Sequence, residues 1–132
     1  MSAPPGRTRA LGLAAVGVLL AGCSSAQAPD VEEVATSFSD PAGDPQQRCD
    51  LLLPAVLAAF EADRSMSCAE AIQELPLQAG TVESMEIWGG AAEVKLGGDT
   101  LFLAETRAGW RVTAAACTPQ GEAPYDCEVE GP

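Results

Sequence analysis

The chain contains no histidine. Histidine is the base of Ser-His-Asp sites and a common zinc ligand, so its absence excludes histidine-dependent triads, histidine metal sites and imidazole pH switches. Positive charge is also scarce: 7 Lys and Arg face 19 Asp and Glu, which gives a net charge of −12. A surface of this sign repels phosphate backbones, so we expect no nucleic-acid partner.

The usual metal and redox signatures are missing as well. The sequence has no C-x-x-C pair and no D-x-D-x-D-G loop, which argues against zinc, thioredoxin-like and EF-hand calcium sites. Acids are numerous, but no pair is singled out by its spacing as a catalytic acid and base. We therefore expect no metal, no cofactor and no catalytic residue. A length of 132 residues predicts one compact domain.

Long apolar runs are missing too, except for one near the N-terminus. Arg7 and Arg9 precede an apolar run over 10–20. That run is about 11 residues, whereas a helix that spans the hydrocarbon core needs roughly 20. Positive residues followed by a short apolar run are typical of a secretory signal peptide, which we place at residues 1–22.

The run ends in Leu20-Ala21-Gly22-Cys23, which resembles the lipobox of bacterial lipoproteins. The resemblance implies that Cys23 carries diacylglycerol and further acyl groups such as palmitate, with residues 23–29 as a tether and 30–132 as the folded domain. Two or more acyl chains make membrane attachment durable. The protein is then anchored on the extracytoplasmic face of the bacterial cell membrane. Two alternatives remain: an ordinary cleaved signal that leaves Cys23 as a free thiol, or a short anchor helix.

Four further cysteines follow: Cys49, Cys68, Cys117 and Cys127. An even number of cysteines in an exported chain predicts two structural disulfides. Three pairings are possible, and the sequence does not choose between them, although the clustering favours 49 with 68 and 117 with 127.

The order of local signals predicts helices first and strands second. Caps and apolar stripes predict helices over about 31–39, from Pro45 onward and after Ser67, with a kink or a new helix at Pro54. Glycine turns then separate β-compatible runs at 81–88, 91–96, 101–107 and 110–117. This order predicts an α+β fold with helices on one face of a curved antiparallel sheet. In the last run we expect Trp110, Val112, Ala114 and Ala116 to share one face of the strand, which is larger and more apolar at its start.

Several motifs resemble a group of small actinobacterial secreted or lipid-anchored proteins of the NTF2-like type. These motifs are Cys49-Asp50-Leu51-Leu52, Ser67-Cys68-Ala69-Glu70-Ala71, Leu75-Pro76-Leu77, Asp99-Thr100-Leu101-Phe102-Leu103, Gly109-Trp110-Arg111-Val112 and the segment from Pro124 to Gly131. The resemblance covers about 31–131. It implies a cone in which helices wrap against a bent sheet around a pocket, and it implies no particular activity.

If a pocket exists, its candidate residues are the large aromatic side chains Trp88, Phe102, Trp110 and Tyr125. The alternative is that they are part of the core, with the Tyr125 ring packed on the predicted Cys117–Cys127 disulfide. Arg107 and Arg111 bracket a predicted turn, where we expect them to pair with nearby acids.

Two functions are compatible with these features. The first is a lipid-anchored, non-catalytic accessory or binding protein whose partner is an envelope protein or a small hydrophobic ligand. The second is a small cone-fold enzyme, isomerase-like or dehydratase-like. That alternative needs a buried acid with a perturbed pKa that faces an apolar cavity.

Overall fold

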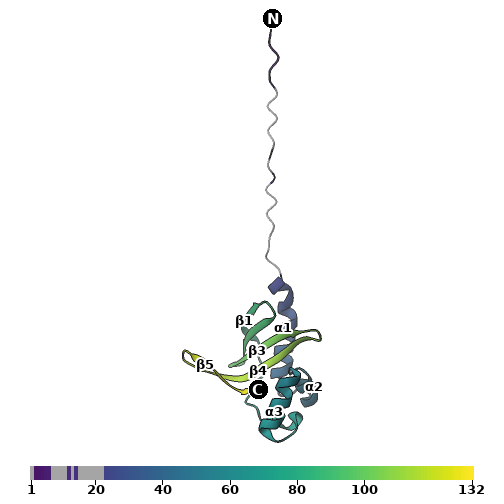
Figure 1. Cartoon of the computed structure of the whole chain (residues 1–132), viewed down its shortest axis with the longest axis vertical. Helices are drawn as coiled ribbons and strands as arrows, with labels where there is room; N and C mark the ends of the chain where they lie inside the picture. The colour runs from purple at the N-terminus through teal and green to yellow at the C-terminus, as the bar shows by residue number, and fades with distance from the viewer. Residues whose placement is uncertain (1, 7–11, 13, 15–22) are drawn as a thin grey trace.

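A computed structural model describes residues 2–6, 12, 14 and 23–132 (Figure 1). Most of the predicted signal peptide therefore lies outside the described residues, as does the side chain of Cys23. Within the described part, helices precede strands: α1 (Cys23–Ser39), α2 (Pro45–Asp50), α3 (Pro54–Arg64), α4 (Cys68–Ala71), a 3₁₀ turn (Ile72–Glu74), β1 (Val82–Trp88), β2 (Ala91–Leu96), β3 (Asp99–Thr106), β4 (Gly109–Gln120) and β5 (Ala123–Val129). None of these helices has both the length and the hydropathy needed to cross a bilayer.

The first helix begins at Cys23, eight residues before the predicted start. The predicted boundary was wrong because Asp30 and Glu33 mimic a capping box just after Pro29. Pro29 instead lies inside the helix, where it lacks the N–H that would bond to the preceding turn. A side-chain contact helps to hold this extra segment on the sheet: Gln27 Nε2 donates to Glu105 Oε2 of β3 at 3.1 Å. The segment over 23–29 is therefore helical rather than extended.

The next three helices begin at the positions marked by local signals: caps at Asp44 and Ser67, and a proline at Pro54. The Asp44 carboxylate accepts the Gln47 N–H at 2.9 Å at the start of α2. Pro54 starts a new helix rather than a kink, because its ring tolerates the first helical position. The Ser67 hydroxyl accepts the Glu70 N–H, at 3.4 Å, as predicted for the cap of α4, and it also donates to the Glu70 carboxylate at 3.1 Å.

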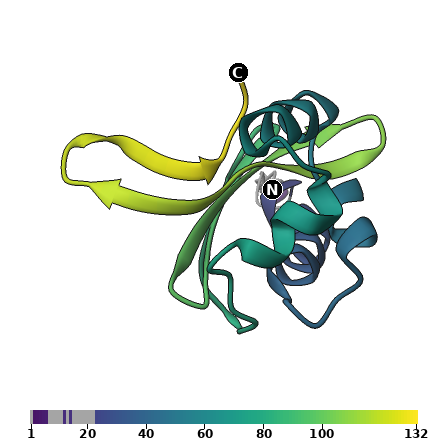
Figure 2. The same cartoon turned by 90° about the horizontal axis from the view of Figure 1, so that it is seen from below.

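The sheet is an antiparallel meander in which the strand order follows the sequence, β1-β2-β3-β4-β5. Four of its strands correspond to the predicted runs, whereas β5 was missed. Its segment contains Pro124 and alternates with acids, so it lacks the apolar pattern of a typical strand. The hairpin formed by β4 and β5 projects away from the helices, as Figure 2 shows.

The predicted alternation along β4 is correct only up to Val112. Pairing shifts from Leu103↔Val112 to Phe102↔Ala114, so Thr113 is an extra residue, a β-bulge. The bulge reverses the two faces, because side chains alternate with a period of two. Ala115 is therefore buried in the core, and Cys117 is buried as well, while Ala114 is partly exposed and Ala116 is partly buried against the core.

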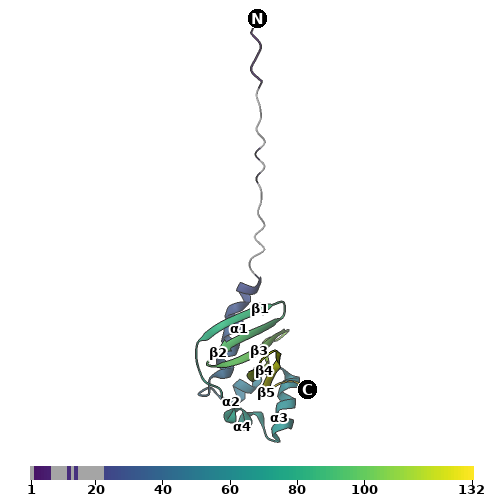
Figure 3. The ribbon, with the colours of Figure 1, turned by 90° about the vertical axis from the view of Figure 1, so that its left-hand side faces the viewer.

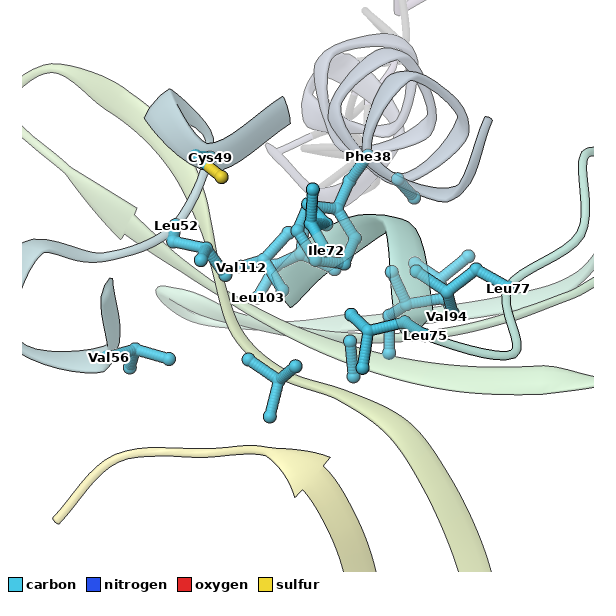
Figure 4. Close-up of a cluster of buried hydrophobic side chains, with 14 of the residues drawn as sticks. Phe38, Cys49, Leu52, Val56, Ile72, Leu75, Leu77, Val94, Leu103 and Val112 are labelled. Carbon is cyan, nitrogen blue, oxygen red and sulfur yellow. The ribbon is translucent and has the colours of Figure 1, made fainter. Parts of the chain in front are cut away.

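The helices lie on one face of this sheet and bury a single core. Figure 3 shows α1 crossing behind the strands, with α2, α3 and α4 gathered at the far end of α1; α1 contacts β1, β2 and β4. At the centre, Phe38 of α1 and Ile72 of the 3₁₀ turn meet Leu103 and Val112 of the sheet (Figure 4). Along α1, Val31 and Phe38 are fully buried, while Val34 is partly buried and packs against the core.

Both favoured disulfide pairings are confirmed. Cys49 of α2 is bonded to Cys68 of α4 and clips two helices together, while Cys117 and Cys127 join β4 to β5 across the ladder. Disulfides of this kind are typical of an oxidising, extracytoplasmic environment. The α+β class and the order of layers are confirmed as well, with the sheet remaining open.

Candidate functional site

The four aromatic residues proposed for a pocket do not come together. Trp88 of β1 pairs with Ala91 of β2, and Phe102 of β3 pairs with Glu93 of β2. Ala91 and Glu93 are two residues apart on β2 and so share a face, which places both aromatic side chains on the sheet face opposite the helices. Tyr125 lies there too, with its ring edge-on to Phe102 at 5.3 Å. Trp110, by contrast, is buried in the core. None of the four lines any of the three cavities described below, and Trp110 takes the alternative position in the core.

The largest of these cavities, of about 510 Å³, lies between the start of α3 and the β3–β4 turn. We call it the α3 groove. One wall comes from the helical segment and the other from the turn: Cys49, Asp50, Leu52, Leu53, Pro54 and Leu57 face Thr106, Arg107, Ala108 and Arg111.

Backbone pairing fixes the two walls of the groove relative to each other. The Val112 N–H donates to the Leu51 carbonyl at 2.8 Å, and the Leu53 N–H donates to the Val112 carbonyl at 3.0 Å. Leu52 thus forms a parallel bridge to β4, beside the stretch of β4 that β5 does not cover. The disulfide from Cys49 fastens the same wall to α4. The groove is therefore built on rigid elements.

The chemistry of the groove is mixed, with leucines and a proline on the helical wall and two arginines on the sheet wall. Arg107 is exposed, whereas Arg111 is partly buried and donates from Nη1 to the Trp110 carbonyl at 2.8 Å. Asp50 is the one acid in the lining. An apolar surface with a few polar groups at its edge is typical of a small-molecule site.

A second cavity, of about 330 Å³, is lined by Arg48 together with Asp40 and Asp44. Arg48 is only 3% exposed. Its Nε donates to the Phe38 carbonyl at 2.8 Å, and its guanidinium carbon lies 6.0 Å from the Phe38 ring centroid. Burial lowers the pKa of this arginine, while the charge of Asp40 opposes the shift. Arg48 thus caps the C-terminal end of α1, which is a structural role that the sequence did not reveal.

A third cavity, of about 280 Å³, is lined by Asp63, Glu128 and Glu130 beside Phe60 and the Cys127 end of β5. Across the described ranges, no three Cys, Asp or Glu side chains are grouped so that they could hold a metal ion. We interpret this acidic cavity as a solvated surface.

Asp99 is the one acid, among the described residues, whose pKa is clearly shifted. Burial raises the pKa, backbone hydrogen bonds from Ala116, Cys117 and Thr100 lower it, and the nearby charge of Glu128 raises it further. Asp99 lines none of the three cavities. The enzyme alternative requires a buried acid that faces an apolar cavity, and Asp99 faces none of these three.

Comparison with known proteins gives no match, whether with protein-family models, curated sequences or solved structures.

The α3 groove was missed by sequence reasoning. Its arginines were recognised only as residues that bracket a turn, and its leucines only as part of a helical stripe. The two walls are about 50 residues apart in the sequence, so only the bridge between Leu52 and Val112 brings them together. A single sequence carries no signal for such a pairing.

Proposed function

We propose that the chain is a lipid-anchored extracytoplasmic binding protein, related to the small NTF2-like lipoproteins of actinobacteria, that takes a small ligand with an apolar body in the α3 groove. The observation that carries the proposal is the groove itself. Its volume of about 510 Å³ falls within the 300–1,000 Å³ that is common for ligand sites.

The sequence supports the anchor. The positive residues, the short apolar run and Leu20-Ala21-Gly22-Cys23 together form a lipoprotein signal. The structure supports the compartment through its two disulfides. Catalysis is not part of the proposal, because the acid with the raised pKa lies away from the cavities.

Intact-mass spectrometry of the protein from the membrane fraction tests the anchor. We expect a chain that begins at Cys23 and carries diacylglycerol, whereas a Cys23→Ala variant should acquire no lipid and keep residues 1–22. The Cys117→Ala variant is a matched control, since it loses a different cysteine and should still be acylated. An unacylated mature chain in the wild type would contradict the proposal.

Photo-cross-linking tests the binding site. The full-length protein in phosphatidylcholine nanodiscs is irradiated with a neutral twelve-carbon alcohol that carries a diazirine, and cross-linked residues are located by peptide mass spectrometry. We expect adducts on the wall formed by Leu53, Pro54 and Leu57. The Leu57→Glu variant should lose them, because an alkyl chain lying on this wall would remove water from the introduced carboxylate, which is costly.

Ala58→Glu provides the matched control, because Ala58 follows Leu57 on the same helix but is exposed and outside the groove. It should cross-link like the wild type. Adducts scattered over the surface, or equal loss in both variants, would contradict a binding site in the groove.

A further inference from the structure

The cationic side chains of this acidic protein are unevenly distributed. Against 19 acids the chain has 7 Lys and Arg; apart from Arg7 and Arg9, they are Arg48, Arg64, Lys95, Arg107 and Arg111. Two of these, Arg107 and Arg111, line the α3 groove, with Asp50 as the one acid. The groove thus has an excess of positive charge in a protein of the opposite sign.

The other cations have different surroundings. Arg48 is bonded to the Phe38 carbonyl, the Arg64 guanidinium lies 5.3 Å from the Phe60 ring centroid, and Lys95 is exposed on the sheet. In the groove, the Asp50 carboxylate accepts a hydrogen bond at 3.0 Å from Nε2 of Gln46, which belongs to the same helix, α2. Of the three cavities in the described part of the chain, the α3 groove is therefore the one that two cations border.

The opposite wall of the groove is apolar and partly open. Leu53 and Leu57 are partly exposed, as expected for side chains that border an open groove. The first turn of α3 adds to the positive character, because no side chain caps it at Leu53. The uncapped helix start adds to the positive charge of Arg107 and Arg111, which remain the main cationic groups of the groove.

We infer that the ligand of the α3 groove is a free single-chain anionic amphiphile of the fatty-acid type. The carboxylate is bound by Arg107 and Arg111, whose guanidinium groups match carboxylate geometry. The alkyl chain lies on Leu53, Pro54 and Leu57, where each added methylene strengthens binding by about fourfold. This inference rests on the proposed function and adds the ligand class to it.

Three diazirine probes with the same twelve-carbon chain test the inference in the nanodiscs described above: a carboxylate, a primary alcohol and a primary amine. We expect the carboxylate to label the groove at least about fivefold more than the amine, because the two guanidinium groups attract a carboxylate and repel the ammonium that the amine forms at neutral pH. Unlabelled laurate should compete.

Charge reversal at Arg107 tests the role of the arginines. Arg107→Glu should reduce carboxylate labelling by about fivefold and leave alcohol labelling within twofold, because the apolar wall is unchanged. Lys95→Glu is the matched control: it reverses the same charge on an exposed residue outside the groove. It should preserve the preference for the carboxylate.

The outcomes separate the inference from the proposed function. Equal labelling by all three head groups in the groove would overturn the anionic ligand and leave the groove a binding site. Absence of groove labelling by every probe would overturn both. Competition by an acidic peptide, or by phosphatidylglycerol in the disc, without competition by laurate would replace the amphiphile with that occupant.

Discussion

The carboxylate of Asp99 accepts the backbone N–H of Cys117 at 3.0 Å through Oδ1 and that of Ala116 at 3.1 Å through Oδ2. These donors lie where β4 stops pairing with β3 and begins to pair with β5. Ala116 has a φ of 54°, in the left-handed region that L-residues rarely adopt. The carboxylate thus replaces the backbone acceptors that the bend removes.

Removal of this carboxylate should destabilise the fold. We expect Asp99→Ala to lower the free energy of unfolding by about 1–2 kcal/mol, because two partly buried N–H groups lose their acceptor. Asp99→Asn keeps one acceptor oxygen and should cost less. Urea denaturation at pH 7 measures both. Two variants as stable as the wild type would show that water replaces the carboxylate without loss.

The same residue should make stability depend on pH in a defined direction. The folded-state pKa of Asp99 is raised, so the folded state holds its proton more tightly than the unfolded state does. The resulting stabilisation is complete below the ordinary aspartate pKa, about 3.9, and is lost as pH rises through the folded-state pKa. We expect the stability of the wild type relative to Asp99→Asn to fall from pH 3 to pH 7.

Urea denaturation of both proteins across this range measures that difference, and the other acids cancel because the two chains share them. The carboxyl ¹³C signal of Asp99 gives an independent reading of its titration. A midpoint below the ordinary aspartate value would reverse the sign and refute the prediction.

Alanine substitutions at two turn glycines, Gly89 and Gly97, should distinguish the cost of backbone strain from the cost of a steric clash. Gly97 and Gly89 have almost the same φ, 57° and 60°. A Cβ on Gly97 would lie 2.7 Å from the Gln78 carbonyl oxygen, whereas one on Gly89 would meet nothing within 4 Å. Gly89→Ala should cost about 1 kcal/mol from strain alone, and Gly97→Ala about 1–3 kcal/mol more. Thermal denaturation should rank them in this order, and equal losses would contradict the close approach of Gln78.

The two disulfides should contribute unequally. Cys49 and Cys68 are 19 residues apart, and Cys117 and Cys127 are 10 apart; the longer loop favours the first pair by about 0.5 kcal/mol. Cys49 and Cys68 are also both buried in the core. We expect the Cys49→Ala/Cys68→Ala double variant to lose about 3–4 kcal/mol and the other double variant about 2–3. Urea denaturation of both tests the order, and a larger loss for the hairpin disulfide would contradict it.

The elements that sequence reasoning placed correctly are those with local causes. Asp44 and Ser67 are caps that bond to residues three positions on, and Pro54 acts on its own turn. Three glycine turns similarly separate the first four strands. These interactions depend only on residues that are close in the sequence, so a local sequence pattern is enough to predict them.

What the sequence did not reveal depends on distant partners. The bulge at Thr113 lies in a run of alanines that offers no contrast between the two faces. The strand β5 forms because Val129 and Cys127 pair with β4, despite a weak local pattern. The start of α1 depends on the contact of Gln27 with Glu105, 78 residues away. The α3 groove also depends on distant residues, since the sequence of neither wall predicts that the other wall will lie beside it.

The first helix connects Cys23 directly to the core, so it also determines where a mechanical force applied at Cys23 would act. Its 17 residues extend about 25 Å from Cys23 to side chains such as Phe38 that are sealed inside the molecule. Under the proposed anchor at Cys23, a pulling force on that end would pass along α1 to its buried residues Val31, Ala35 and Phe38, without a flexible linker in between.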